Sequence, residues 1–218
     1  MDAIAALPPY AHINKEAVQC VAQASLRYEV PELLLHAILV KENGRMGKCT
    51  KNKDGTYDCG LAQINTSWTQ QFARQGVRME HLVYDTCTNI QASAYILKAN
   101  YLKKNRDWFS AIVAYNIGPN NWTPSRYAVG QRYGADVVRN WWGFQNWVDA
   151  SQGISRAAPA SMPATAPQAV KSRGTLRKKE APHQLVFSTA SEAATSQPAL
   201  NMLENPAAEA LASSPSLP

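Results

Sequence analysis

The sequence predicts an α+β fold, mostly helical with a small β-hairpin, in residues 1–150, followed by a disordered tail in residues 151–218. Apolar residues recur with helical spacing over most of residues 1–150. One segment among them, residues 49–59, carries a tight-turn signal instead. All six tryptophans, nine tyrosines and four cysteines precede residue 151, whereas 33 of the last 68 residues are Ala, Ser or Pro. A segment of that composition buries too little apolar surface to offset the entropy lost on ordering.

Size and charge narrow the class of protein. With 218 residues and 45% hydrophobic composition, the chain can form one domain with a real core, or two small ones. A net charge of +6 with 17% charged residues argues against a nucleic-acid arm, so we expect no nucleic acid partner. The longest nearly apolar run, residues 33–40, is too short to cross a bilayer, so no transmembrane segment is expected. The first ten residues contain no recognisable signal peptide.

Local signals mark the first two helices. Asn14 can cap the first helix. Pro31 suits the first turn of the second, and Gly44 suits its left-handed C-terminal cap. The apolar face expected for the first helix is Ala17, Val18, Val21, Ala22 and Leu26.

Further helices are expected after the hairpin. Asp85 precedes one of them and Asp107 another, while Gly130 and Gly134 are expected to interrupt the last region. The expected segments are residues 66–75, a helix beginning after Asp85, residues 107–118, and one or two helices within residues 124–148.

The segment between the second and third helices is predicted to be a hairpin. Asp54-Gly55 is a strong turn signal. A three-residue loop that places Gly55 in the left-handed region makes the numbers of paired residues sum to 108. Thr50 then faces Asp58, and Cys49 faces Cys59, within disulfide reach.

The four cysteines are expected to form two disulfides. The hairpin register favours Cys49–Cys59, which leaves Cys20–Cys87 as the second pair. Free buried thiols and a zinc site are the alternatives. A metal is not expected, because the chain has no Cys-x-x-Cys and its four histidines keep no ligand spacing with the cysteines. Disulfides indicate an oxidising compartment, so we expect a periplasmic protein although no signal peptide is recognisable.

Glu42 is the strongest candidate for a catalytic side chain. It follows Leu35, Ile38 and Leu39 at helical spacing and so shares their apolar stripe. It also lies in the last turn of the helix, where the macrodipole is negative. Desolvation and dipole are both expected to raise its pKa and make it a proton donor near neutral pH. The alternative is an exposed helix-end glutamate beside Lys41.

Asp58, on the hairpin opposite Thr50, is a candidate second carboxylate. Alone, it would be interpreted as a solvated acid at a strand end. A pair of carboxyl groups, one on a helix end and one on a hairpin, suits glycoside chemistry. One carboxyl then protonates the leaving oxygen while the other faces the positive charge that develops at the sugar carbon.

Three blocks of the sequence resemble one enzyme family. They are Glu42, residues 60–65 (Gly-Leu-Ala-Gln-Ile-Asn) and residues 114–119 (Ala-Tyr-Asn-Ile-Gly-Pro). In this order and spacing they resemble the signature of lysozyme-like lytic transglycosylases, the SLT domain. The similarity is greatest to the small enzymes encoded with type IV secretion and conjugal transfer systems. The resemblance implies a mostly helical, lysozyme-like fold with a cleft between a helical lobe and a small hairpin lobe.

The resemblance also implies roles for individual residues. Glu42 would act as general acid and then as base, and Gln63 would hydrogen-bond sugar in the cleft. Tyr115 would position Glu42, and Asn116 would support the substrate or the loop.

The hairpin carries a second resemblance. Residues 52–60 are similar to the hairpin of animal-type lysozymes. Asp58 falls where those enzymes carry their second carboxylate, which stays ionised beside a glutamate of raised pKa.

Two residues depart from the transglycosylase pattern. Asn43 replaces the usual serine, and Ala62 replaces the usual methionine.

We therefore expect residues 1–150 to form a lytic transglycosylase that cleaves the β-1,4 bond between N-acetylmuramic acid and N-acetylglucosamine. Glu42 would protonate the glycosidic oxygen and then help the C6 hydroxyl attack, giving a 1,6-anhydro end without any cofactor. The expected partner is the peptidoglycan glycan strand. The expected task is local opening of the cell wall for a conjugation or type IV secretion apparatus.

Two alternatives remain. One is a lysozyme-type hydrolase that uses Glu42 and Asp58. The other is a non-catalytic wall-binding scaffold, which would have no need of Glu42, Gln63 and Tyr115 together. The predicted tail contains a basic cluster. Its charges would either be solvated on a linker or bind a partner electrostatically, for example secretion components or a membrane surface. Its cations are Lys171, Arg173, Arg177, Lys178 and Lys179.

Overall fold

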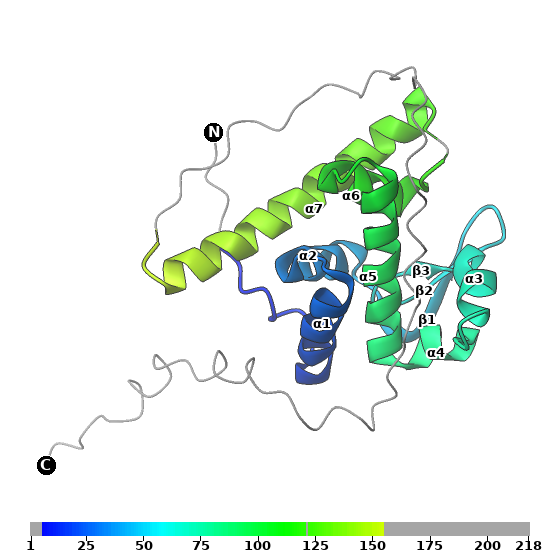
Figure 1. The fold of residues 1–218 in the computed structure, drawn as a ribbon, viewed down its shortest axis with the longest axis horizontal. Coiled ribbons are helices and arrows are strands. Elements are labelled where there is room, and N and C mark those ends of the chain that lie inside the picture. The colour runs from blue at the N-terminus through cyan, green and yellow to red at the C-terminus, as the bar shows by residue number, and fades with distance from the viewer. Residues whose placement is uncertain (1–5, 121, 155–218) are drawn as a thin grey trace, which may run out of the picture.

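The computed structural model describes residues 6–120 and 122–154. Residues 155–218, which hold the basic cluster and nearly all of the predicted tail, lie outside the described part of the chain. The described residues form the expected α+β fold, mostly helical with a small antiparallel sheet (Figure 1). In chain order the elements are α1 (Lys15–Tyr28), α2 (Glu32–Glu42), β1 (Arg45–Lys51), β2 (Tyr57–Gly60), β3 (Ile64–Asn65), the 3-10 helix η1 (Thr66–Trp68), α3 (Thr69–Ala73), α4 (Met79–Tyr84), α5 (Thr86–Lys103), α6 (Trp108–Ile117) and α7 (Pro124–Ser151).

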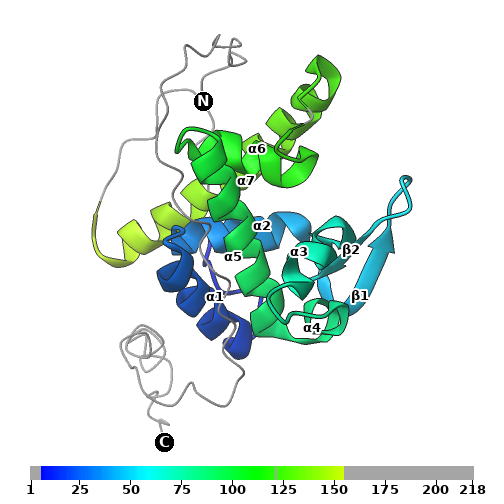
Figure 2. The same ribbon diagram turned by 45° about the vertical axis from the view of Figure 1, so that its right-hand side comes forward.

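Helix α2 lies at the centre of the helical lobe. It packs against α1 and α7, while α5 packs against α1 and α6. The sheet lies to one side of the helices with α3 and α4 beside it, and the hairpin of β1 and β2 projects outward (Figures 1 and 2). A helix that is apolar on all sides is buried on all sides. This holds for the middle of α2, where the consecutive buried residues are Leu34, Leu35, His36, Ala37, Ile38 and Leu39. None of the described helices is long and apolar enough to cross a membrane.

Three predicted helix starts are confirmed by side-chain caps. The side chain of Asn14 accepts a hydrogen bond from the amide of Ala17 at 2.8 Å. Asp85 and Asp107 do the same at the starts of α5 and α6. The face of α1 was predicted less well, because Leu26 is 81% exposed. The buried residues of α1 are Ala17, Cys20, Val21, Ala24 and Tyr28.

Two predicted helix ends are wrong. Helix α2 ends with Asn43 in the left-handed conformation, at φ 48°, rather than with Gly44. Gly44 serves close packing instead, since a Cβ there would overlap the carbonyl oxygen of Gly60. The helix predicted at residues 66–75 is shorter and consists of η1 and α3. Helix α4 had not been predicted.

Residues 124–151 form one continuous helix, α7, which corrects the predicted interruptions at Gly130 and Gly134. Both glycines are buried against α6. A Cβ at Gly130 would lie 2.7 Å from Val113, and one at Gly134 would lie 2.8 Å from the ring of Phe109. The glycines therefore allow α6 and α7 to approach closely without breaking the helix.

The hairpin register is confirmed. Strands β1 and β2 pair antiparallel with Cys49 opposite Cys59 and Thr50 opposite Asp58, and β3 pairs with the other edge of β2. Gly55 has the left-handed φ of 86° that the three-residue loop requires. The structure contains both expected disulfides, Cys49–Cys59 within the hairpin and Cys20–Cys87 between α1 and α5.

Candidate active site

A cleft of about 540 Å³ lies between the hairpin lobe and the helical lobe. Part of its wall comes from the hairpin tip at residues 52–54, and part from the loop after α6, at Gly118 and Pro119. The side chains predicted from the sequence to form the site all line this cleft. They are Glu42, Asp58, Gln63, Tyr115 and Asn116.

Glu42 occupies the last position of α2, where Asn43 turns the chain toward the hairpin. Its side chain is half-buried and opens onto the cleft. The pKa of Glu42 is raised to about 7. Burial is the main cause and the negative charge of Asp58 adds to it, while a hydrogen bond from Tyr133 and the charge of Lys41 act in the opposite direction. A carboxyl group with such a pKa can donate a proton at neutral pH.

Tyr133, on α7, is the functional residue that the sequence did not reveal. Its hydroxyl donates a hydrogen bond to Oε1 of Glu42 at 2.5 Å, and its ring is buried. The adjacent residue Lys41 forms an ion pair with Asp136 of α7 at 2.7 Å. These two contacts fix the last turn of α2 against α7, so Glu42 is not the exposed helix-end glutamate of the alternative interpretation. No local pattern marks Tyr133, because it lies 91 residues from Glu42 in the sequence.

Tyr115 lies in the cleft wall but does not make the contact expected of it. Its hydroxyl donates to the carbonyl oxygen of Ala62 at 2.9 Å and lies 3.0 Å from Oγ of Ser93. The hydroxyl that donates a hydrogen bond to Glu42 belongs to Tyr133 instead. Tyr115 therefore supports the segment between β2 and β3, which carries Gln63.

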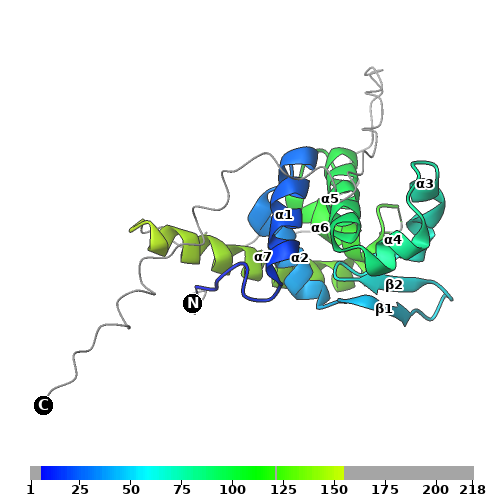
Figure 3. The same ribbon diagram turned by 90° about the horizontal axis from the view of Figure 1, so that it is seen from below.

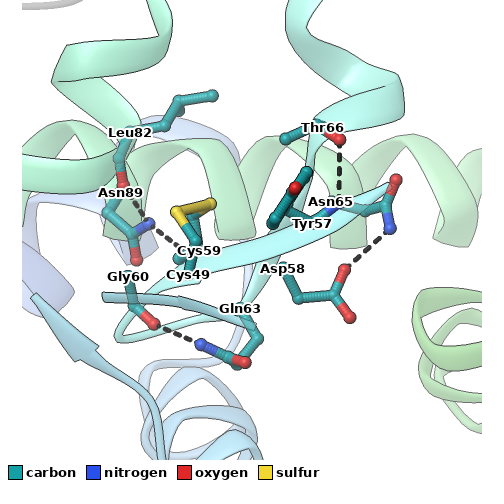
Figure 4. The surroundings of a disulfide bond; sticks show 10 residues. All are labelled: Cys49, Tyr57, Asp58, Cys59, Gly60, Gln63, Asn65, Thr66, Leu82 and Asn89. Carbon is teal, nitrogen blue, oxygen red and sulfur yellow. Dashed lines mark hydrogen bonds between the residues drawn. A yellow bond between two sulfur atoms is a disulfide. The ribbon is translucent and has the colours of Figure 1, made fainter. Parts of the chain in front are cut away.

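The segment that carries Gln63 is also held from α5. Asn89 is buried and donates to the carbonyl oxygens of Cys59 and Leu82, at 3.0 and 2.7 Å (Figure 4). Its own oxygen accepts from the amide of Ala62 at 2.9 Å. Gln63 itself has a left-handed φ of 48° and donates from Nε2 to the carbonyl oxygen of Gly60 at 2.9 Å (Figure 4). The side chain is thus anchored to its own loop at the edge of the cleft.

Asp58 approaches the cleft from the hairpin. Its Oδ1 accepts a hydrogen bond from Nδ2 of Asn65, on β3, at 2.7 Å, and the disulfide of Cys59 lies next to it on the strand (Figure 4).

Asn116, the last of the predicted site residues, is exposed in the last turn of α6. The site thus combines a half-buried carboxyl from the helical lobe with a hydrogen-bonded carboxyl from the hairpin lobe. Across residues 6–120 and 122–154, no three His, Cys, Asp or Glu side chains gather as metal ligands.

Comparison with known proteins identifies the family of this chain. Residues 19–134, which run from α1 to Gly134 of α7, match the transglycosylase SLT domain. The X polypeptide of Escherichia coli is 32% identical over 140 residues, which cover 64% of this chain and 79% of that protein. Invasion protein IagB of Salmonella typhimurium is 29% identical over 130 residues, covering 59% and 79% of the two chains. Protein IpgF of Shigella flexneri is 29% identical over 123 residues, covering 56% and 78%.

Proposed function

Since the chain belongs to the transglycosylase SLT domain family, we propose that it acts on peptidoglycan as a lytic transglycosylase and that Glu42 carries its chemistry. The bond cleaved is the β-1,4 bond between N-acetylmuramic acid and N-acetylglucosamine. The observation that carries this proposal is the half-buried Glu42 carboxyl, whose pKa is raised to about 7 at the wall of the cleft.

The reaction uses one carboxyl group twice. Glu42 gives its proton to the glycosidic oxygen as the bond to the anomeric carbon breaks, and the leaving sugar departs with a free hydroxyl. The Glu42 carboxylate then takes the proton of the C6 hydroxyl while that oxygen attacks the anomeric carbon. The product is a 1,6-anhydro end, and Glu42 is again protonated. The hydroxyl of Tyr133 holds the carboxyl in place during both steps.

A hydrolase of the lysozyme type is the second candidate, and Asp58 favours it. Asp58 lines the same cleft and its charge acts on Glu42. In that reaction Asp58 stabilises the developing positive charge or attacks the sugar carbon, and water completes the cleavage. In the transglycosylase reaction the sugar's own groups stabilise the intermediate, and Asp58 mainly shapes the hairpin.

The products distinguish the two reactions. Purified peptidoglycan is digested with the protein, and the fragments are analysed by mass spectrometry. We expect fragments with anhydro ends, which are lighter by one water than fragments with reducing ends. Reducing ends alone would establish the hydrolase, and binding without any cleavage would establish the third alternative, a wall-binding scaffold.

The biological setting follows from the substrate and the disulfides. We propose that the protein acts in the periplasm, because two disulfides form in an oxidising compartment. Its task there is to open the cell wall locally for a conjugation or type IV secretion apparatus, whose components the tail contacts. The similarity to a protein named for invasion, IagB, is consistent with a role at the cell envelope.

A further inference from the structure

The first strand of the sheet carries an unusual concentration of positive charge. Arg45, Lys48 and Lys51 of β1 are exposed, and Lys53 follows at the hairpin tip. No acidic residue lies between Glu42 and Asp54 in the sequence. We call Arg45, Lys48 and Lys51, together with Lys53, the basic strand.

Within the described chain these cations have no acidic partner, in contrast to some other cations on the surface. Lys41, Lys98 and Arg139 each lie within 2.8 Å of a carboxylate. Among residues that the structure describes, no carboxylate forms an ion pair with any member of the basic strand. Four unpaired cations in nine residues repel one another, and an anion bound across them would relieve that repulsion.

The place of the basic strand in the fold relates it to the cleft. The strand begins three residues after Glu42 and leads to the tip, where Lys53 lines the cleft beside Asp54. Within the described chain, β1 pairs only with β2, so its other edge is open. Figure 3 shows β1 at the outer side of the sheet. Lys53 therefore lies at the cleft itself, and the other three cations follow along the strand that leads away from it.

An exposed aromatic ring borders the same strand. Tyr84, at the end of α4, is 72% exposed and lies beside Gly47, where a Cβ would be 3.6 Å from its ring. Next to Gly47 the pairing of β1 with β2 shifts register, between Arg45 and Cys49. Tyrosine and arginine side chains are enriched where proteins bind partners. The surface thus combines positive charge, an open strand edge and an exposed ring.

We propose that the basic strand binds the carboxylates of the stem peptides on the peptidoglycan strand that occupies the cleft. This inference rests on the proposed function, which places the glycan in the cleft. Each N-acetylmuramic acid carries a short peptide with free carboxylates, so the polymer presents negative charge alongside its neutral sugar backbone. The basic strand then makes the protein prefer glycan that still carries its peptides over glycan that has lost them.

Binding to two forms of soluble glycan strand tests the proposal. One form carries uncross-linked stem peptides, and the other has been stripped of them by an amidase. The binding measurements use the Glu42→Gln background, which keeps the strands intact. We expect the peptide-bearing strand to bind roughly tenfold more tightly at low salt, with the difference falling as salt rises. The added substitutions Arg45→Glu, Lys48→Glu and Lys51→Glu should remove that difference and leave binding of the stripped strand unchanged.

Two further variants separate charge from folding. A control with Lys15→Glu, Arg74→Glu and Arg106→Glu has the same change in net charge on exposed residues away from β1, and it should keep the preference. A milder triple variant with glutamine at positions 45, 48 and 51 should show the same loss with an unchanged melting temperature.

Three outcomes would overturn the proposal. Unchanged binding in the triple variants would mean that the cations only keep the open edge from pairing with other strands. If the triple variants bound the peptide-bearing and the stripped glycan equally more weakly, the basic strand would contact sugar or the hairpin would be damaged. An absence of preference in the parent would remove the stem peptide as the ligand. Failure of the proposed function would appear separately, as a lack of cleavage by the protein with Glu42 intact.

Discussion

The two walls of the cleft hold the same chemical group in opposite surroundings. On the helical wall, Glu42 ends a helix whose middle is fully buried and receives one hydrogen bond, from the buried Tyr133. On the hairpin wall, Asp58 lies on a small strand and accepts from the amide of Asn65. The dry environment disfavours the charged form of Glu42 and so favours its protonated form. The comparison indicates that the fold, rather than the residue type, makes Glu42 the proton donor.

Removing the acid from the helical wall should have the largest effect. Glu42→Gln keeps the shape of the side chain but leaves no proton to donate, so we expect a loss of about a thousandfold or more in kcat. Cleavage rates on purified peptidoglycan, with folding checked by circular dichroism, measure it. A loss below about tenfold would show that another group supplies the proton.

The same variant should become more stable than the parent protein at alkaline pH. The pKa of Glu42 in the folded state is raised above its ordinary value of 4.5, so the parent loses stability as pH rises from 4.5 through about 7. Glu42→Gln removes this loss, which is at most about 3 kcal/mol. Its melting temperature should exceed that of the parent at pH 8 and match it at pH 4.

Tyr133→Phe should have the next largest effect. The hydrogen bond from Tyr133 holds the pKa of Glu42 down, so its loss should move the alkaline limb of the pH–rate profile to higher pH. The carboxyl also loses its anchor, and we expect roughly a tenfold fall in rate at pH 7. Tyr115→Phe is the matched control. It removes an equivalent hydroxyl from the same cleft without touching Glu42, so it should leave the alkaline limb in place.

Asp58→Asn should have the smallest effect on rate if the enzyme is a transglycosylase. We expect a loss of about tenfold or less, equivalent to about 1.4 kcal/mol of barrier. The charge of Asp58 raises the pKa of Glu42, so the alkaline limb should move to lower pH, opposite to Tyr133→Phe. A loss as severe as that of Glu42→Gln would instead make Asp58 a direct participant and favour the hydrolase.

The hairpin wall was more predictable from the sequence than the helical wall. The Asp54-Gly55 turn fixes the register of its neighbours by local geometry, so Asp58 could be placed opposite Thr50 without tertiary information. The caps Asn14, Asp85 and Asp107 act within three residues and could be predicted for the same reason.

The surroundings of Glu42 depend on contacts between distant segments. Tyr133 reaches Glu42 only because α2 packs against α7, and α7 itself was expected to be broken at Gly130 and Gly134. Those glycines were interpreted by their low helix propensity, whereas packing against α6 decides their role. The raised pKa could be anticipated from the apolar neighbours of Glu42. The choice of Tyr133 over Tyr115 as its partner could not, because both hydroxyls lie far away in sequence.

The protonation state of Glu42 is the central claim, and a direct titration tests it. The side-chain carboxyl carbon can be followed by ¹³C NMR against pH in the intact protein, and its signal identified by its absence from the Glu42→Gln variant. We predict a titration midpoint at about 7. A midpoint near the ordinary value of 4.5 would mean that Glu42 is ionised at neutral pH and would contradict its role as the general acid.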